Sequence, residues 1–311
     1  MAAAAPDQHK PARRWHIAVF LAPAVLVYTA IMIIPLFSTL VQSLFNTVEG
    51  RNAFVGLGNF ATLFGDPRWA ASFWNALWNN TWFFIIHMLV QNPIGVLLAA
   101  LLSNPNLRLR GFYRTAIFVP TILSFVIVGF VWKLILSPLW GIAPSMLDTI
   151  GLKHLFSPWL GQEASALTAL ALVSVWQFVG IPMMLIYAAL LSIPDEVVEA
   201  AEIDGVSGLS QFFKIQLPLI LPTIGIISIL TFVGNFNAFD LIYVSQGAQA
   251  GPNGATDILG TLLYRTFFGF QLQQGDTNMG SAIATMMFLI ILVGVSIYLF
   301  LIQTRLRRYQ F

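Results

Sequence analysis

The chain has 311 residues, of which 58% are hydrophobic and 9% are charged, and its formal net charge is +2. Soluble domains carry about a quarter charged residues, so this composition excludes a water-soluble globular protein. The small net charge argues against nucleic acid as a partner. With no cysteine and only four scattered histidines, a disulfide scaffold is excluded and a metal site is not expected. The sequence therefore predicts an integral membrane protein.

Six apolar runs are each long enough to cross a bilayer, which needs about 20 apolar residues per helix. They predict transmembrane helices at residues 17–45, 77–103, 112–136, 166–192, 217–240 and 280–303, between terminal tails at 1–16 and 304–311. Lys10, Arg13 and Arg14 resemble the charged start of a signal peptide. The first run is too long for one, however, and no small-residue cleavage site follows it. We therefore expect an uncleaved first span and one membrane domain, residues 17–303.

The distribution of lysine and arginine between the spans predicts the orientation. Six spans place both termini on one side of the membrane. That side would carry ten basic residues, Lys10, Arg13, Arg14, Arg108, Arg110, Arg114, Lys214, Arg305, Arg307 and Arg308, against five on the other, Arg51, Arg68, Lys133, Lys153 and Arg265. Because the more basic side stays in the cytoplasm, we expect both termini there.

Helix-breaking residues interrupt four of the predicted spans. They are Pro23 and Pro35 in the first, Pro93 and Gly95 in the second, Pro120 in the third, and Gly180 and Pro182 in the fourth. A single break of this kind is commonly a kink that serves packing alone. A freed backbone group in the membrane is otherwise tolerated where protein or a water-filled cavity supplies a partner. Breaks in four of six spans favour a bundle that moves and lines a cavity.

The sequence contains no recognisable chemistry for supplying energy. No lysine follows a glycine, so there is no phosphate-binding loop of the GxxxxGK type, and HExxH and Gly-x-Ser-x-Gly motifs are also missing. The spans hold few ionisable residues. His87 is expected to be a hydrogen-bonded interior histidine, and Lys133 to extend its amine to the interface. This pattern argues against both a membrane enzyme and a secondary transporter, which usually needs ionisable groups deep in the membrane.

The connection between the fourth and fifth spans, residues 193–216, differs from the other loops on its side. Five of the chain's 13 acidic residues lie in it: Asp195, Glu196, Glu199, Glu202 and Asp204. Ser192 and Ser207 are candidate caps for two short helices, and Gly205 is a candidate left-handed cap between them. The sequence predicts a helix–turn–helix elbow with an acidic exposed side. The alternative is a solvated connector without a partner.

Glu199-Ala200-Ala201, Gly205 and Ile215-x-Leu217-Pro218 resemble the EAA loop of permease subunits in bacterial ABC importers. Phe54–Phe60 and Asn235–Asp240 resemble the carbohydrate-uptake branch of that family, the maltose-permease-like proteins. The segment Ser245–Pro252 is longer than the Thr-Gly-Gly-Pro often found there. The resemblance covers nearly the whole chain. It implies an all-α fold of six transmembrane helices, the type I importer permease fold, in the bacterial inner membrane.

The resemblance also implies the partners and the coupling site. A second permease subunit would complete the pathway, and two cytoplasmic ATP-binding subunits would bind ATP and magnesium, so that this chain binds no cofactor of its own. Their docking site would be formed by Glu199, Ala200, Ala201, Asp204 and Gly205. A periplasmic or lipid-anchored solute-binding protein would dock on the loops at 46–76, 137–165 and 245–279.

The candidate substrate pathway consists of polar and aromatic side chains in the fourth and fifth spans, because amides and aromatic faces bind sugars. The candidates are Trp176, Gln177, Tyr187, Thr231, Asn235, Asn237 and Asp240. Thr231 and Asn235 match positions that line the sugar site of maltose-type permeases. The alternatives are that the amides hold helices together and that Asp240 belongs to an outer gate. The solute is expected to be a sugar, or alternatively a polyol, a glycerol phosphate or a sulfonated sugar.

Overall fold

The computed structural model describes residues 15–48, 51–104, 106–271 and 273–303. The α-helices in these ranges are α1 (Trp15–Tyr28), α2 (Ile34–Gln42), α3 (Gly58–Gly65), α4 (Pro67–Ile86), α5 (Asn92–Ser103), α6 (Arg110–Phe118), α7 (Phe125–Ile135), α8 (Ile142–Thr149), α9 (Glu163–Phe178), α10 (Gly180–Leu191), α11 (Asp195–Ile203), α12 (Gly208–Gln211), α13 (Leu217–Phe236), α14 (Asp240–Gln246), α15 (Leu259–Phe268) and α16 (Thr277–Ile297). Shorter 3-10 or π turns are η1 (Thr29–Ile33), η2 (His87–Gln91), η3 (Val119–Ile122), η4 (Lys153–Leu155), η5 (Trp159–Gly161), η6 (Phe212–Gln216) and η7 (Tyr298–Gln303), and the strands are β1 (Phe45–Val48) and β2 (Arg51–Phe54). Most of the predicted terminal tails, residues 1–14 and 304–311, lie outside the described residues.

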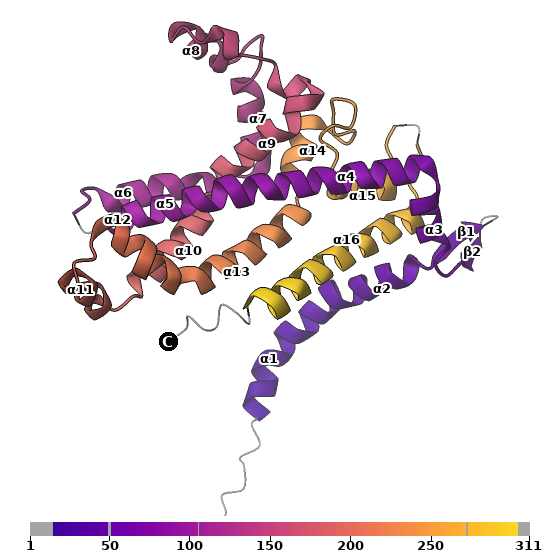
Figure 1. Ribbon diagram of the computed structural model, residues 1–311. Helices are drawn as coiled ribbons and strands as arrows, with labels where there is room; N and C mark the ends of the chain where they lie inside the picture. The colour runs from indigo at the N-terminus through magenta and orange to yellow at the C-terminus, as the bar shows by residue number, and fades with distance from the viewer. Residues whose placement is uncertain (1–14, 49–50, 105, 272, 304–311) are drawn as a thin grey trace, which may run out of the picture.

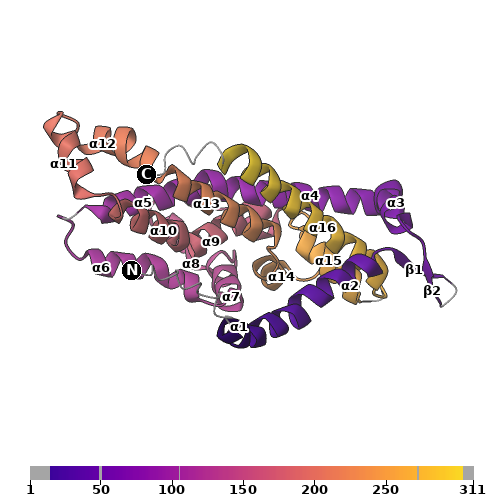
Figure 2. The ribbon, with the colours of Figure 1, turned by 90° about the horizontal axis from the view of Figure 1, so that it is seen from below.

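Helices long and apolar enough to cross a membrane account for all six predicted spans. Four are continuous, Val19–Gln42, Pro67–Ser103, Gly208–Gln246 and Thr277–Phe300, and two are bent pairs, Arg110–Ile122 with Phe125–Ile135 and Glu163–Phe178 with Gly180–Leu191. The long helices run between two ends of the bundle (Figure 1). We call the end that carries α11 and α12 the elbow end and the end that carries β1 and β2 the hairpin end; Figure 2 shows the two at opposite extremes of the molecule.

Three predicted boundaries or shapes were wrong. The first helix ends at Gln42, because Phe45 already begins β1. The second begins at Pro67 rather than at residue 77, since the Asp66 carboxylate caps it by accepting from the backbone N–H of Arg68 at 2.9 Å. The third is not one straight helix but bends by 99°. Pro120 lies in the 3-10 turn before that bend, where its ring interrupts the α-helical hydrogen bonds.

Prolines also explain three wide turns in the spans. The π turns η1, η2 and η6 each end two residues before a proline, respectively Pro35, Pro93 and Pro218. Proline has no N–H to donate to the carbonyl four residues earlier. The helix accommodates this loss in a turn with i→i+5 bonds, such as the bond from the Asn92 N–H to the His87 carbonyl. The helix therefore continues through each proline but presents a different face on either side of the turn.

A small antiparallel hairpin was not predicted. β1 pairs with β2 from Phe45 opposite Phe54 to Val48 opposite Arg51. Asn59 holds the base of the hairpin, because its Nδ2 donates to the carbonyl oxygens of Ser43 at 2.8 Å and Phe45 at 2.7 Å. Strands of four residues leave too short a pattern for recognition in a sequence dominated by helices.

The buried core is divided among several helix contacts rather than gathered in one centre. α5 and α10 approach closely at Gly95, where an added Cβ would lie 3.0 Å from the Pro182 ring. Leu102 of α5, Met183 of α10 and Ile220 of α13 belong to one buried cluster. In the first span, by contrast, no residue of the most apolar stretch is buried. An exposed apolar helix face is stable only against lipid or another membrane subunit.

Candidate functional site

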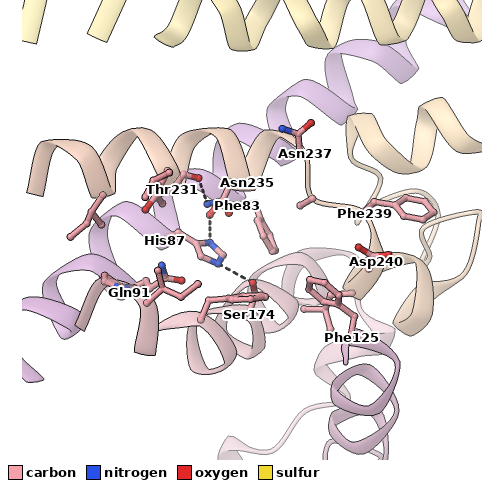
Figure 3. A pocket seen from close by; sticks show the side chains of 18 of the residues that line it. Phe83, His87, Gln91, Phe125, Ser174, Thr231, Asn235, Asn237, Phe239 and Asp240 are labelled. Atoms are coloured by element: carbon pink, nitrogen blue, oxygen red, sulfur yellow. Dashed lines mark hydrogen bonds between the residues drawn. The ribbon is translucent and has the colours of Figure 1, made fainter. Parts of the chain in front are cut away.

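A cavity of about 310 Å³ lies between the second, fourth and fifth spans (Figure 3). Its polar lining consists of His87, Gln91, Ser174, Thr231, Asn235, Asn237 and Asp240, and its aromatic lining of Phe83, Phe125, Phe178 and Phe239. Small-molecule sites are typically clefts of about 300–1,000 Å³ with apolar walls and a few polar groups. The size and the lining therefore suit a small polar molecule.

Two side chains join the second and fourth spans at the cavity wall. His87 Nδ1 lies 2.8 Å from the Phe83 carbonyl oxygen, and His87 Nε2 lies 3.0 Å from Ser174 Oγ. Because a carbonyl oxygen only accepts, Nδ1 carries the hydrogen, and in the neutral imidazole Nε2 then accepts from the Ser174 hydroxyl. His87 is 3% exposed. The expected hydrogen-bonded interior histidine is what the structure contains.

The fifth span is held to the second by a short polar chain. Thr231 Oγ1 and the Asn92 side-chain amide lie 3.3 Å apart. One turn further along, Asn235 Nδ2 donates to the Thr231 carbonyl oxygen at 2.7 Å. Asn80 Nδ2 in turn donates to the Asn235 carbonyl oxygen at 2.8 Å. These bonds fix the face of α13 that lines the cavity.

The structure brings together four of the seven predicted pathway residues. Thr231, Asn235, Asn237 and Asp240 line the cavity. Thr231 and Asn235 lie four residues apart, on one face of α13. Sequence reasoning missed Gln91, which lies on the same face as His87 at the π turn before Pro93. The signal available was the proline itself, since π turns are frequent at functional sites.

Trp176, Gln177 and Tyr187 do not line this cavity, and their predicted role stays a prediction. The Trp176 ring contacts the Trp132 ring edge-on at 5.4 Å. Gln177 Nε2 donates to the Leu123 carbonyl oxygen at 3.0 Å, at the bend of the third span. Tyr187 is buried, with the Arg114 guanidinium 5.8 Å from its ring centre. Trp176 lies about 200° around α9 from Ser174, which does face the cavity.

The connection at the elbow end is a helix–turn–helix. Gly205 has φ +77°, its N–H donates to the Glu202 carbonyl oxygen at 3.0 Å, and the next N–H, of Val206, donates to the Ala201 carbonyl oxygen at 2.8 Å. This pair of bonds is the Schellman motif that ends a helix at a left-handed glycine. Gln211 Nε2 donates to the Val198 carbonyl oxygen at 3.1 Å and fastens α12 to α11. The turn is therefore rigid.

The two serines do not cap these helices as expected. The Ser192 hydroxyl donates back to the Ala189 carbonyl oxygen at 2.7 Å, so α11 begins after Pro194 instead. Ser207 stands at the cap of α12 but makes no capping bond there. A hydroxyl at the end of a span satisfies the free carbonyls of the preceding helix, and this competes with capping the next one.

The elbow projects from one end of the bundle (Figure 1). The predicted coupling residues Glu199, Ala200, Asp204 and Gly205 are exposed, while Ala201 is buried. Among the residues that the structure describes, none of the elbow's carboxylates takes part in an ion pair. Ile203 is 86% exposed beside them. An acidic surface with apolar side chains is typical of a site that docks a basic partner.

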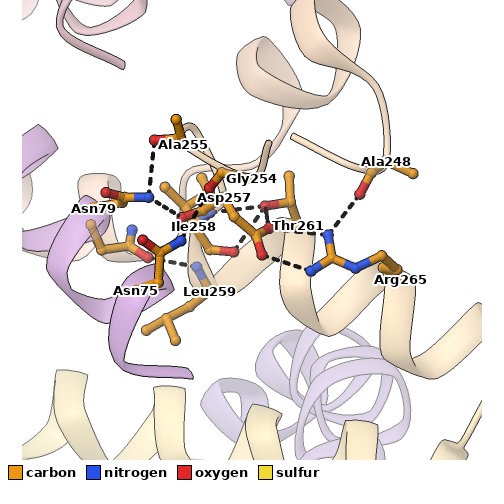
Figure 4. A network of polar contacts seen from close by, with 11 residues as sticks. Asn75, Asn79, Ala248, Gly254, Ala255, Asp257, Ile258, Leu259, Thr261 and Arg265 are labelled. Atoms are coloured by element: carbon orange, nitrogen blue, oxygen red, sulfur yellow. Dashed lines mark hydrogen bonds and ion pairs between the residues drawn. The ribbon is translucent and has the colours of Figure 1, made fainter. Parts of the chain in front are cut away.

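At the hairpin end a buried ion pair fixes the long loop after α14 (Figure 4). Arg265 Nη2 lies 2.6 Å from Asp257 Oδ2, and Arg265 Nη1 donates to the Ala248 carbonyl oxygen at 2.8 Å. Thr261 Oγ1 donates to Asp257 Oδ1 at 2.7 Å. From α4, Asn79 Nδ2 donates to the Asp257 carbonyl oxygen at 2.8 Å. The lengthened segment Ser245–Pro252 is thus part of an ordered loop.

Comparison with known proteins decides the family. Residues 91–308 match the model of the binding-protein-dependent transport system inner membrane component. The chain belongs to this family. The predicted resemblance to ABC importer permeases and the predicted all-helical fold are both confirmed by this match. The matched segment includes the elbow and the part of the second span that carries Gln91.

Individual relatives agree over most of the chain. A probable ABC transporter permease protein of Bacillus subtilis (strain 168), YurN, is 34% identical over 88% of this chain and 91% of its own length. The lactose transport system permease protein LacF of Rhizobium radiobacter is 32% identical over 81% of this chain and 83% of its own. Among solved structures, a chain of a bacterial ABC transporter involved in the import of the acidic polysaccharide alginate matches with a TM-score of 0.76, covering 93% of this chain and 97% of that one, at 22% identity. This last likeness concerns the fold.

Proposed function

We propose that this chain is a permease subunit of an ATP-driven importer that moves a sugar or a sugar-like solute across the bacterial inner membrane by alternating access. The observation that carries the proposal is the cavity between the second, fourth and fifth spans, whose walls combine amides, hydroxyls and phenyl rings. Sugars are bound by such groups. Membership of the family and the likeness to a lactose permease support the same class of solute.

Several cavity residues would bind the solute together. Asn235, Asn237 and Gln91 offer amides to its hydroxyl groups, and Phe239 and Phe125 offer flat apolar faces. The bends in the third and fourth spans, of 99° and 41°, border this space. Rocking of the helix pairs about these bends would open the cavity to one side of the membrane at a time.

The elbow would transmit the energy of ATP hydrolysis. ATP and magnesium would be bound by two partner subunits, and this chain would bind no cofactor and hydrolyse nothing itself. Glu199 would pair with a basic residue of such a subunit, and the rigid left-handed turn at Gly205 would hold α11 in the partner's cleft. The elbow end would then face the cytoplasm, together with both termini.

The remaining partners follow from the surfaces left open. A second permease subunit would cover the apolar first span, because no residue in the most apolar stretch of that span is buried. A periplasmic or lipid-anchored solute-binding protein would dock at the hairpin end, on the loops at 46–76, 137–165 and 245–279. Such a docking surface benefits from a fixed loop geometry, and the Asp257–Arg265 pair supports one of these loops.

The proposal is tested by purifying the tagged chain in mild detergent from its own bacterium and identifying the proteins that accompany it. Recovery of ATP-binding subunits and a second permease is expected. The assembled complex, placed in liposomes with its binding protein, should take up labelled sugar only when ATP is supplied. A chain that purifies alone and moves solute without ATP would overturn the proposal in favour of a secondary transporter.

A further inference from the structure

The cavity wall carries one full charge, and it is negative. The twenty residues that line the cavity include no lysine and no arginine, and the only carboxylate among them is Asp240. Asp240 is exposed, in the first turn of α14. Among the described residues, no basic side chain lies within ion-pairing distance of it. A solute with a carboxylate or phosphate would therefore meet a like charge without a compensating cation.

The same cavity contains a buried acceptor without a donor. Gln91 is 6% exposed, and its Oε1 accepts no hydrogen bond from any residue that the structure describes. Most buried side-chain oxygens are satisfied, so an unsatisfied one calls for an explanation. Gln91 lines the cavity from the π turn η2, four residues after His87, and Figure 3 shows both side chains at the same hollow.

The neighbouring polar groups leave this acceptor to a ligand. The hydrogen on His87 Nδ1 is directed to the Phe83 carbonyl oxygen, and the Ser174 hydroxyl is directed to His87. The Thr231 hydroxyl is paired with the Asn92 amide. None of these three donors reaches Gln91 Oε1, which accepts no hydrogen bond within the part of the chain that the structure describes. A hydroxyl group of a bound molecule would supply one.

We propose that this cavity selects an uncharged polyhydroxylated solute: Gln91 Oε1 accepts a hydrogen bond from one of its hydroxyl groups, and Asp240 rejects anionic sugars such as uronic acids and sugar phosphates. The inference rests on the proposed import function and narrows its substrate class. It makes the glycerol phosphate and sulfonated-sugar alternatives unfavourable, because both are anions. It also sets this chain apart from its structural neighbour, which is described as taking part in the import of an acidic polysaccharide.

The charge rule is tested on the complete importer in detergent, without the solute-binding protein, which would otherwise select the ligand first. Lactose and maltose are each compared with the same disaccharide oxidised at C6 to the uronic acid. Binding is read from the rise of the unfolding temperature with ligand concentration. The neutral member of a pair should bind about tenfold more tightly than the anionic one, as expected for a like charge in a partly screened site.

Substitution of Asp240 distinguishes charge from the lost C6 hydroxyl. In Asp240→Asn the tenfold disadvantage of the uronic acid should largely disappear. In Glu196→Gln, which removes a carboxylate at the elbow far from the cavity, the disadvantage should be retained. If the uronic acid binds the unaltered importer as tightly as the neutral sugar does, the charge rule is overturned while sugar import stands. If neither neutral nor anionic sugars bind, both the rule and the proposed function fail.

The acceptor is tested by Gln91→Leu, which keeps the volume but removes the oxygen. Affinity for the neutral sugar should fall about tenfold, the typical loss for one hydrogen bond to a ligand. Gln246→Leu is the control, because Gln246 donates to the Leu160 carbonyl oxygen outside the cavity. It should leave the affinity unchanged. Equal affinities in Gln91→Leu and the unaltered importer would overturn the role of Gln91, even if the charge rule holds.

Discussion

Asn80 and Asn235 are 155 residues apart in sequence, and the Asn80 Nδ2 donates to the Asn235 carbonyl oxygen at 2.8 Å. On its other side, Asn80 Oδ1 accepts from the Leu259 N–H at 2.7 Å. One buried amide therefore satisfies the end of α13 and the start of α15 at once. Asn80 is fully buried, so water cannot replace it at either contact. The cavity-lining face of α13 and the hairpin-end loop are therefore connected through this one side chain.

We predict that Asn80→Leu lowers the stability of the protein by about 1–3 kcal/mol, since it removes the hydrogen bond that the buried Leu259 N–H donates and leaves the Asn235 carbonyl with backbone donors such as the Ala238 N–H. The unfolding temperature in detergent measures this. Asn75→Leu is the matched control on the same helix. Asn75 Nδ2 also donates to a loop carbonyl, that of Gly254 at 3.0 Å, but at an exposed site, where water replaces the lost bond and the cost should stay below about 1 kcal/mol. Equal losses in the two variants would contradict this account.

A substitution at Gly205 should impair the coupling of transport to ATP hydrolysis without impairing folding. Its φ of +77° is unfavourable for any other residue, yet nothing lies within 4 Å of an added Cβ. Gly205→Asp should therefore insert into the membrane normally, with a backbone strain of about 1–2 kcal/mol. ATP-driven uptake should be lost, because the substitution distorts the turn and adds a negative charge at the proposed contact. Membrane abundance and uptake are measured together.

Gly151 provides the control for that strain. It has φ +74° and equally open surroundings, but it follows α8, away from the elbow. Gly151→Asp should show the same small loss of stability and leave the co-purification of the ATP-binding subunits unchanged, whereas Gly205→Asp should weaken it. Normal uptake in Gly205→Asp would count against docking of the elbow to an ATP-binding subunit.

Much of the architecture could be predicted because it depends on long patterns. The apolar runs identify six spans, and the Glu199–Pro218 motif identifies the elbow and its left-handed glycine. The β1–β2 hairpin and the 99° bend at Pro120 depend on a few residues each. Such short signals are weak beside the hydrophobic pattern of a membrane chain.

The cavity lining was predicted only in part, for a geometrical reason. A residue's type indicates what it can bind, but its direction changes by about 100° per residue along a helix. Thr231 and Asn235 share a face and both reach the cavity, whereas Trp176 lies on the opposite side of α9 from Ser174. Gln91 was missed because the π turn that directs it is set by Pro93 and not by the pattern of its own neighbours.

Packing between α13 and α16 depends on the smallness of Gly294. A Cβ there would lie 2.3 Å from Phe232 Cζ. The Phe232 ring has little room to withdraw, because the rings of Phe84 and Phe236 lie 5.4 and 4.6 Å from it, centre to centre. We predict that Gly294→Ala lowers stability by about 1–3 kcal/mol through overpacking. Gly111→Ala, on open α6, should instead gain up to about 1 kcal/mol from helix propensity. The unfolding temperature should fall in Gly294→Ala and rise in Gly111→Ala. Shifts of the same sign in the two variants would refute this prediction.

The ion pairs at Asp257 and at Asp148 should differ sharply in how much each contributes to the free energy of unfolding. Arg265 and Asp257 have side chains 19% and 5% exposed, whereas Lys153 and Asp148 have side chains 71% and 56% exposed. Arg265→Met strands the Asp257 carboxylate in a buried site and should cost about 3–5 kcal/mol. Lys153→Met should cost less than about 1 kcal/mol, because water solvates the freed Asp148. The additional change Asp257→Asn should restore part of the stability lost in Arg265→Met, since it removes the uncompensated charge. A double variant less stable than Arg265→Met alone, by thermal unfolding in detergent, would show that the carboxylate is held chiefly by Thr261 and the loop rather than by the arginine.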